Sequence, residues 1–319
     1  MVAVYSAHPT APLSLHARVP DLDAAGFRAL DGMRLPAMRG SIHLLPRETA
    51  HLAFRAVPEA PAQAVGRLRY AGVSQALYRR LRGAVLAAAA EPRTVRQLAD
   101  ASGAGRATAQ VVGALAREGV LVRVGAEGLR SNALRYVAAE VEEADADEAL
   151  AWLAGEYLRA FGPARPRDFA WWTGAPAGRA RRALESVETE ALDDGLLLPV
   201  GDRRGFEAAR RPRGTVDLLP KWDCYTMGYA PDGRTRLADP DVLSRCYESG
   251  GDGRPLVLVD GAAAGAWSLR PGRAVEVDLE LFEEPGPRLR RALAARVDAV
   301  RALLDPLSRR AGAGGTGSS

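Results

Sequence analysis

Cysteine and lysine are almost missing from this 319-residue sequence, which has two cysteines, Cys224 and Cys246, and a single lysine, Lys221. Two thiols cannot build a disulfide framework or a four-thiolate zinc site. The longest apolar runs, such as residues 84–90, are far shorter than the ~20 residues that cross a bilayer, and residues 1–7 lack the basic start of a secretory signal. These absences exclude a membrane protein and a disulfide-stapled secreted miniprotein. They predict a cytoplasmic protein with no membrane partner.

The basic residues are nearly all arginine, and they are distributed unevenly. Residues 1–137 hold 18 arginines against nine acidic residues, a balance of +9, whereas residues 138–212 carry −5 and residues 213–319 are neutral. Because alanine and glycine are also abundant, a GC-rich genome can explain the number of arginines. Their position is more informative, since a positive first segment favours a polyanionic partner such as nucleic acid.

Helix, strand and turn signals divide the chain into five regions and predict an α+β fold, with tandem winged-helix domains packed around a small C-terminal antiparallel β-barrel. The regions are a partial first winged helix (1–90), a second winged helix (91–138), a third winged helix (139–212), a β-barrel-like domain with a terminal helix (213–306) and a disordered tail (307–319). Because Met1 opens directly on an apolar segment, we expect the chain to begin inside a domain.

Region 91–138 has the most complete pattern. Its expected elements are a Thr94 cap, a helix over 95–101, a turn over 102–105, a helix over 106–118 ended by Gly119, and strands over 120–124 and 129–137. Helix, turn, helix and a two-stranded wing are typical of a winged helix, whose second helix usually enters the major groove of DNA.

The other regions carry weaker signals. In region 1–90 we expect helices over 21–34, 47–57 and 70–90 and a strand over 39–45. In region 139–212 we expect helices over 149–161, 166–170 and 177–193, a cap at Gly195, a strand over 196–200 and a wing tip over 201–205. In region 213–306 we expect strands over 215–219, 255–260, 265–269 and 274–279, then an amphipathic helix over 289–304.

The candidate DNA contacts are polar side chains of the positive first segment and of one later loop. Arginine can pair with phosphate or guanine through two hydrogen bonds, although a solvated helix face explains individual arginines equally well. The candidates are Arg39, Arg79, Arg80, Arg82, Arg106, Thr108, Gln110, Arg123, Arg130, Lys221 and Trp222.

The most specific segment is Leu218-Leu-Pro-Lys-Trp-Asp-Cys-Tyr-Thr-Met-Gly-Tyr229, where a strand meets an irregular loop. One interpretation is architectural, with Trp222 in the core and Asp223 capping a turn. The other is functional, with Asp223 as a catalytic carboxylate.

At these residues the sequence resembles the AlkZ-like (YcaQ-related) winged-helix DNA glycosylases. The resemblance rests on residues 38–46 (MRGSIHLLP), 166–174 (PRDFAWWTG), the 218–229 segment, and 256–261 (LVLVDG) leading to Trp267. It implies tandem winged helices around a small β-barrel, duplex DNA carrying alkylated bases as the partner, a monomer, and no cofactor. It also implies excision of alkylated purines or unhooking of interstrand crosslinks, often as self-resistance in an antibiotic biosynthesis cluster.

One departure affects the chemistry that the resemblance implies. The family has a glutamine–apolar–glutamine (or aspartate) motif before the arginine-glycine strand, whereas Ser6 and His8 stand nearest to that place here. Asp223 would stabilise an oxocarbenium-like sugar, and His8 would orient or deprotonate the attacking water. His8 stands beside Pro9, and its position favours a simple exposed end residue over a catalytic one.

Three functional classes therefore remain open: a DNA glycosylase, a non-catalytic DNA-binding regulator or shield over adducts, and a winged-helix protein adaptor. The lost glutamine motif favours the second class, and two non-equivalent winged helices without an evident dimerisation domain argue against an ordinary dimeric regulator. The four histidines, His8, His16, His43 and His51, have pair spacings of eight, which no helix or hairpin ligand set uses, so the sequence predicts no metal site.

Overall fold

The computed structural model describes all residues except 1–2, 20, 127, 132 and 306–319, so the predicted tail over 307–319 lies outside the described residues. The chain forms two compact units. The first unit contains residues 1–7 and 31–200, and the second contains residues 8–30 and 201–319. Each unit is therefore built from two separate stretches of chain.

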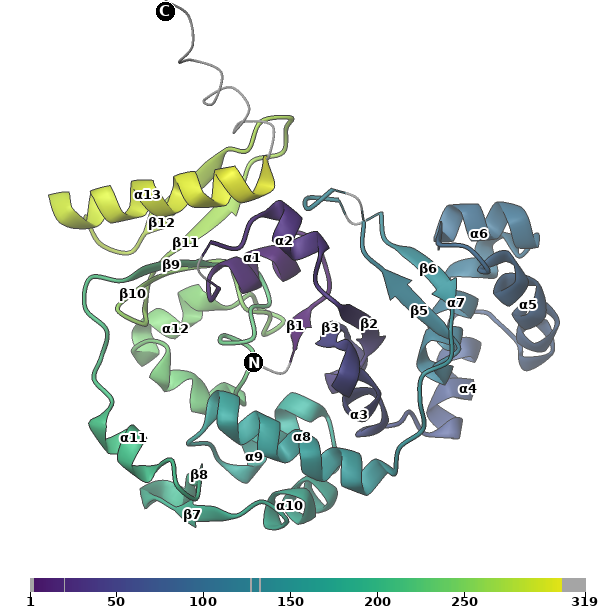
Figure 1. The fold of residues 1–319 in the computed structure, drawn as a ribbon, viewed down its shortest axis with the longest axis horizontal. Coiled ribbons are helices and arrows are strands. Elements are labelled where there is room, and N and C mark those ends of the chain that lie inside the picture. The colour runs from purple at the N-terminus through teal and green to yellow at the C-terminus, as the bar shows by residue number, and fades with distance from the viewer. Residues whose placement is uncertain (1–2, 20, 127, 132, 306–319) are drawn as a thin grey trace, which may run out of the picture. The chain divides into compact units, whose positions relative to one another are not determined.

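A six-stranded antiparallel sheet forms the centre of the first unit, in the order β1-β3-β2-β5-β6-β4 (Figure 1). Its strands are β1 (Val4–Tyr5), β2 (Gly32–Pro36), β3 (Ile42–Pro46), β4 (Arg93–Thr94), β5 (Leu121–Val124) and β6 (Arg135–Ala138). Strands β2 and β3 pair over five residues, and β2 joins β5 where Arg34 lies opposite Arg123. Strands expected in two different regions, 1–90 and 91–138, therefore share one sheet.

Three helices pack together at the β4–β5–β6 part of this sheet: α5 (Gln75–Ala88), α6 (Val95–Ser102) and α7 (Thr108–Glu118) (Figure 1). The Thr94 side chain accepts a hydrogen bond from the Gln97 amide at 3.3 Å, as the predicted cap requires. Leu98, Val111 and Leu115 are fully buried in the shared core. The predicted helices of region 91–138 are confirmed in order and within two residues of their expected starts and ends.

Gly119 ends α7 in the left-handed region at φ +78°, and a Cβ there would lie 3.0 Å from Phe54 Cε1. We expect Gly119→Ala to lower the free energy of unfolding by about 2 kcal/mol, because backbone strain and a steric clash add. Urea denaturation checks this. Gly83→Ala in α5 is the matched control, because its Cβ meets nothing within 4 Å; it should be neutral or stabilising. Equal effects of both substitutions would contradict the prediction.

Two helices of region 1–90 are shorter than predicted. The expected helix over 21–34 is only α2 (Ala24–Arg28), part of the second unit, because Asp23 caps it and Gly32 already lies in β2 against Leu44. The expected helix over 70–90 is preceded by α4 (Pro61–Tyr70), and a turn containing Gly72 at φ +76° separates α4 from α5. Between α2 and α4 in sequence lie η1 (Met38–Gly40), η2 (Arg47–Thr49) and α3 (Ala50–Arg55), besides the strands β2 and β3.

The last part of the first unit contains α8 (Ala146–Phe161), α9 (Pro166–Thr173) and α10 (Ala177–Glu185), and α8 packs against α3 and α10. The predicted helix over 177–193 is wrong after Glu185. A hairpin of β7 (Thr189–Ala191) and β8 (Leu197–Pro199) follows, because Asp194 and Gly195 both adopt positive φ, as an aspartate-glycine hairpin turn favours. The predicted wing tip over 201–205 is also wrong, since α11 (Arg203–Ala208) begins there.

The second unit contains a four-stranded antiparallel sheet in the order β12-β11-β10-β9. Its strands are β9 (Val216–Leu219), β10 (Leu256–Val259), β11 (Ala262–Leu269) and β12 (Val277–Leu281). The unit also contains α1 (Thr10–His16), α2, α11, η5 (Pro231–Arg236), α12 (Pro240–Cys246) and a C-terminal helix. The predicted barrel is wrong. Among the described residues β9 and β12 do not pair, and four short strands are too few to close a filled barrel.

Helix α13 (Pro287–Leu304) packs against β9 and confirms the predicted terminal amphipathic helix. It buries Leu293, Val297 and Val300, while Arg296 pairs with Asp217 at 2.5 Å. Even this helix, with 18 residues, is too polar for a bilayer, and within the described part of the chain no other helix has the length and apolarity to cross one.

Candidate active-site residues and nucleic-acid interface

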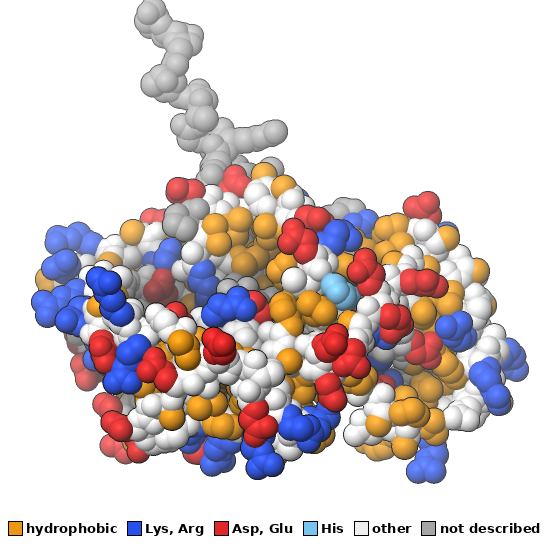
Figure 2. Space-filling model, turned by 60° about the horizontal axis from the view of Figure 1, so that its bottom comes forward, with side chains coloured by type: hydrophobic (Ala, Val, Ile, Leu, Met, Phe, Trp, Pro, Cys, Tyr) orange, Lys and Arg blue, Asp and Glu red, His pale blue; other side chains and the backbone are white. Residues whose placement is uncertain are grey.

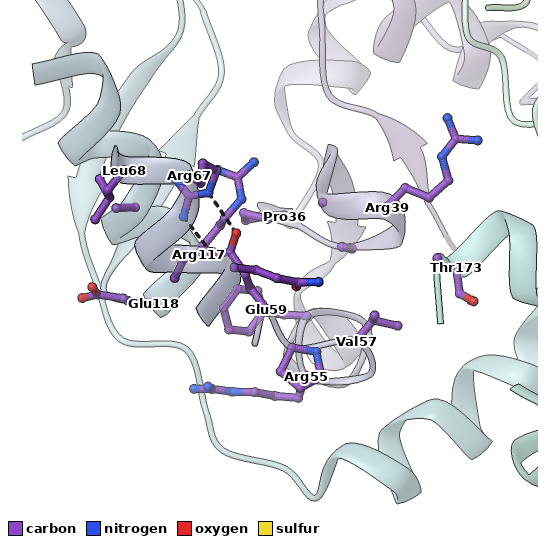
Figure 3. A pocket seen from close by; sticks show the side chains of 18 residues that line it. Pro36, Arg39, Arg55, Val57, Glu59, Arg67, Leu68, Arg117, Glu118 and Thr173 are labelled. Carbon is purple, nitrogen blue, oxygen red and sulfur yellow. Dashed lines mark hydrogen bonds and ion pairs between the residues drawn. The ribbon is translucent and has the colours of Figure 1, made fainter. Parts of the chain in front are cut away.

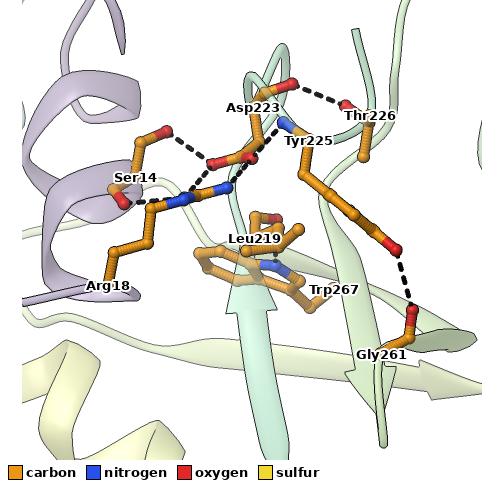
Figure 4. A network of polar contacts seen from close by, with 8 residues as sticks. All are labelled: Ser14, Arg18, Leu219, Asp223, Tyr225, Thr226, Gly261 and Trp267. Atoms are coloured by element: carbon orange, nitrogen blue, oxygen red, sulfur yellow. Dashed lines mark hydrogen bonds and ion pairs between the residues drawn. The ribbon is translucent and has the colours of Figure 1, made fainter. Parts of the chain in front are cut away.

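Asp223 follows β9, and its carboxylate is completely buried in the second unit. Helix α1 supplies the Ser14 hydroxyl, which donates to Oδ2 at 2.7 Å (Figure 4). The Arg18 guanidinium donates to Oδ2 at 2.9 Å and to Oδ1 at 2.5 Å, and the Tyr225 amide donates to Oδ1 at 2.8 Å. Four donors therefore hold both oxygens, and a positive charge balances the carboxylate.

This geometry supports the architectural interpretation of Asp223. The bond from the Tyr225 amide is the turn cap that the sequence allowed, and the ion pair connects α1 to the loop after β9. Both oxygens of the buried carboxylate already accept hydrogen bonds, and Arg18 already balances its charge. Through these contacts Asp223 joins the loop after β9 to the segment that contains Arg18.

The architectural interpretation placed Trp222 in the core, but the structure leaves its side chain half-buried. The residue has a φ of +58°. Its neighbour Lys221 pairs with Glu248 at 2.8 Å and lies 4.8 Å from the centre of the Trp222 ring. Backbone strain at a bulky side chain is uncommon and marks a position that the surrounding loop holds in place.

The loop after β9 also meets the strand pair β10–β11. Tyr225 donates its hydroxyl to the Gly261 carbonyl at 3.2 Å, and Trp267 donates its indole N–H to the Leu219 carbonyl at 2.8 Å (Figure 4). Burial raises the pKa of the Cys224 thiol to about 12, which leaves the thiol unreactive. The two C-terminal segments that carry the family resemblance, 218–229 and 256–267, therefore form one hydrogen-bonded structure.

Ser6 and His8 are both buried, with 1% and 2% of their surface exposed. Within the first unit, Arg123 donates from Nη1 to the Ser6 hydroxyl at 3.3 Å and from Nη2 to the Tyr136 hydroxyl at 2.9 Å. Within the second unit, the His8 ring lies edge-on to Phe27 with 5.7 Å between centroids. The structure encloses both side chains and does not expose either at the surface.

The predicted DNA contacts fall into two groups. Exposed side chains are Arg39, Arg79, Arg80, Arg106 and Arg130. Three of the others already have polar partners: Arg82 pairs with Glu118, Arg123 donates to Ser6 and Tyr136, and Lys221 pairs with Glu248. Trp222 and Gln110 are half-buried, and Thr108 is 1% exposed and donates its hydroxyl to the Gly105 carbonyl. On the face drawn in Figure 2, basic and acidic side chains are interspersed and form no continuous basic patch.

A cavity of about 540 Å³ in the first unit contains charged residues that the sequence did not single out. We call it the arginine cavity and define it by four arginines and two glutamates that line it, Arg39, Arg55, Arg67, Arg117, Glu59 and Glu118 (Figure 3). Only Arg39 was a predicted site residue. The others belong to α3, the loop after it, α4 and α7, and nothing in their spacing indicates that they meet.

The four histidines do not form a common metal site. His43 bonds through Nδ1 to the Ser41 carbonyl, His16 bonds to the Leu22 carbonyl, and His51 lies 4.0 Å from Glu142. Across the described ranges, no three histidine, cysteine or acidic side chains are grouped so that they could hold a metal ion.

Comparison with known proteins gives a family and a fold. A family model described as "DNA glycosylase AlkZ-like" matches residues 2–303. Among solved structures, the DNA glycosylase AlkZ of Streptomyces sahachiroi is similar, with a TM-score of 0.70, 21% sequence identity, and coverage of 93% of this chain and 87% of that chain. No curated protein matches the sequence. The likeness in structure extends over most of both chains and concerns the fold.

Proposed function

This chain belongs to the AlkZ-like DNA glycosylase family, and from that membership we propose that it binds duplex DNA and hydrolyses the N-glycosidic bond of alkylated purines. The observation that carries the proposal is the family match over residues 2–303. The structure supports it because the four motif segments of the resemblance meet in pairs: Arg39 stacks on Trp171, and Trp267 bonds to Leu219.

The proposed DNA-binding elements are two winged helices of the first unit. The first consists of α5, α6 and α7 with the wing β5–β6, and the second of α8, α9 and α10 with the hairpin β7–β8. The exposed arginines Arg79, Arg80 and Arg106 are the proposed phosphate contacts, because each can donate two hydrogen bonds without breaking a described ion pair. Binding of this kind depends weakly on sequence and strongly on salt.

The chemistry needs little from the protein, because an N7- or N3-alkylated purine is cationic and already a good leaving group. The enzyme stabilises an oxocarbenium-like sugar and positions a water molecule. Ser6 and His8, which stand nearest in sequence to the family's glutamine motif, are the proposed water-orienting residues. Asp223 takes a positioning role in this proposal, because its carboxylate is buried against Arg18.

The test is incubation of the protein with a duplex that contains one N7-methylguanine, followed by mass spectrometry of the released base and alkaline cleavage at abasic sites. We expect base release from this duplex and none from the unmodified duplex. His8→Ala should slow release about 100-fold with DNA affinity retained, as loss of a general base does. A protein that binds the duplex but releases no base from any N7-alkylated substrate would contradict the proposal.

A second candidate function is non-catalytic binding that shields an adduct. It is favoured by the burial of Ser6, His8 and Asp223 and by the departure from the glutamine motif. The same experiment separates the two functions, because a shield binds alkylated duplex, releases no base and protects the lesion from a second glycosylase. A sequence-specific footprint on undamaged DNA would instead indicate a regulator.

A further inference from the structure

The charges of the arginine cavity do not balance. Glu59 pairs with Arg67 through two bonds of 2.9 and 2.7 Å, and Glu118 is engaged by Arg82 and the Tyr78 hydroxyl. Arg55 pairs with Glu143 at 2.7 Å. Arg39 and Arg117 remain, and neither has a carboxylate partner among the residues that the structure describes. Two guanidinium groups without an ion pair among the described residues therefore line one cavity.

Arg117 is held in place by its own helix and by burial. Its Nη1 donates to the Gly113 carbonyl at 3.1 Å, and its Nη2 would lie 3.9 Å from a Cβ placed on Gly40. Burial and then the charge of Arg67 lower the pKa of Arg117 from its ordinary value, and together they outweigh the opposing charges of Glu59 and Tyr136. An anion in the cavity would relieve this imbalance.

Arg39 is fixed at the other end of the cavity by unusual backbone geometry. It adopts φ +55°, Gly40 follows at φ +68°, and the Arg39 guanidinium stacks 4.3 Å above the Trp171 ring. A Cβ on Gly174, itself at φ +78°, would lie 3.3 Å from Arg39 Cγ, so a larger residue there would strain the backbone and crowd Arg39. In Figure 3 the Arg39 side chain points away from Arg67 and Arg117, so the two free guanidinium groups are separated along the cavity.

We propose that the arginine cavity binds the sugar-phosphate backbone of one DNA strand, with Arg117 and Arg39 contacting two separate phosphates. This inference rests on the proposed function, since it names the part of the protein that grips the duplex. Guanidinium groups suit phosphate because they donate paired hydrogen bonds. The exposed rim, which includes Arg39, Gln63 and Gly174, leaves the cavity accessible to a chain that passes through.

The test measures affinity for an undamaged fluorescent duplex by anisotropy over a series of salt concentrations. Arg39→Gln and Arg117→Gln should each weaken binding about fivefold to tenfold at 100 mM salt, and each should reduce the slope of log affinity against log salt by about one. The double variant should reduce the slope by about two. Arg117→Lys should restore the slope, because it keeps the charge.

The matched control is Arg47→Gln, which removes the same charge from an exposed arginine that is already paired with Asp31. It should leave the slope unchanged. Urea denaturation of every variant separates loss of binding from loss of folding. If the wild-type protein binds the duplex but Arg117→Gln has the same salt slope as the wild type, this inference is wrong and the proposed glycosylase function stands. If the wild-type protein binds no duplex at all, the proposed function is wrong as well.

A free phosphate ion is the alternative ligand, because it offers the arginine cavity the same phosphate oxygens as a DNA strand. The thermal midpoint of the protein is therefore also measured against inorganic phosphate, with the Arg117→Gln variant beside it. A saturable stabilisation that this variant abolishes, together with an unchanged duplex slope, would assign the cavity to a small anion and contradict the DNA-strand proposal.

Discussion

Arg18→Met is expected to lower the free energy of unfolding by about 3 kcal/mol, because it leaves a buried carboxylate without its counter-charge. Asp223 is 0% exposed, and Arg18 donates hydrogen bonds to both of its carboxylate oxygens. Urea denaturation at pH 7 measures the loss. The control is Arg301→Met in α13, whose arginine pairs with an exposed Asp298 at 3.1 Å and should change stability very little.

A double variant tests the cause of that loss. Arg18→Met combined with Asp223→Leu removes both charges, so no ion remains unpaired in the interior. It should be clearly more stable than Arg18→Met alone, as for other buried pairs replaced by apolar side chains. If the double variant is the less stable of the two, packing and not charge compensation explains the contribution of Arg18.

His43 should make the first unit sensitive to mild acid. Burial lowers the pKa of His43 to about 4, although the bond to the Ser41 carbonyl opposes the shift and the charge of Arg39 adds to it. The unfolded chain binds this proton near pH 6.5, whereas the folded chain binds it only near pH 4. Stability is therefore complete above pH 6.5 and falls as the pH drops toward 4, by about 3 kcal/mol in total.

The comparison of wild type with His43→Gln isolates this contribution from the titration of carboxylates. Unfolding free energies at pH 7.5, 6.0, 5.0 and 4.5 should decline more steeply for the wild type, by up to about 1.4 kcal/mol per pH unit. Below pH 4 the two curves should run in parallel. Parallel curves over the whole range would mean that His43 titrates normally in the folded protein.

Elements with strong local signals were predictable from the sequence. Thr94 and Gly119 mark the start and end of the helical pair in region 91–138, and the structure has α6 and α7 there. Four strands after residue 213 and the terminal helix were also predicted in the right order, although β11 begins three residues earlier than expected and β12 lies at 277–281 instead of 274–279. Each signal lies within a few residues of the element that it specifies, so no distant contact is needed to interpret it.

Where a local signal was misread, the structure corrected it. The helix predicted over 177–193 ends at Glu185 in the structure, and Thr189–Ala191 form β7 of a hairpin whose turn contains Asp194 and Gly195 at positive φ. For Asp223 the sequence left an architectural and a catalytic interpretation open, and it did not show which residue balances the charge of the carboxylate. Its partner Arg18 lies 205 residues earlier in the chain, and no spacing rule connects the two.

The sequence by itself determined the family, the order of most helices and strands and the two interpretations of Asp223, because motifs and capping residues act locally. Only the tertiary structure decided that the second sheet is open, that Asp223 is neutralised by Arg18, and that Arg39 and Arg117 line one cavity. These features depend on which distant segments pack together, and packing is set by the summed burial of many side chains that no short window of sequence contains.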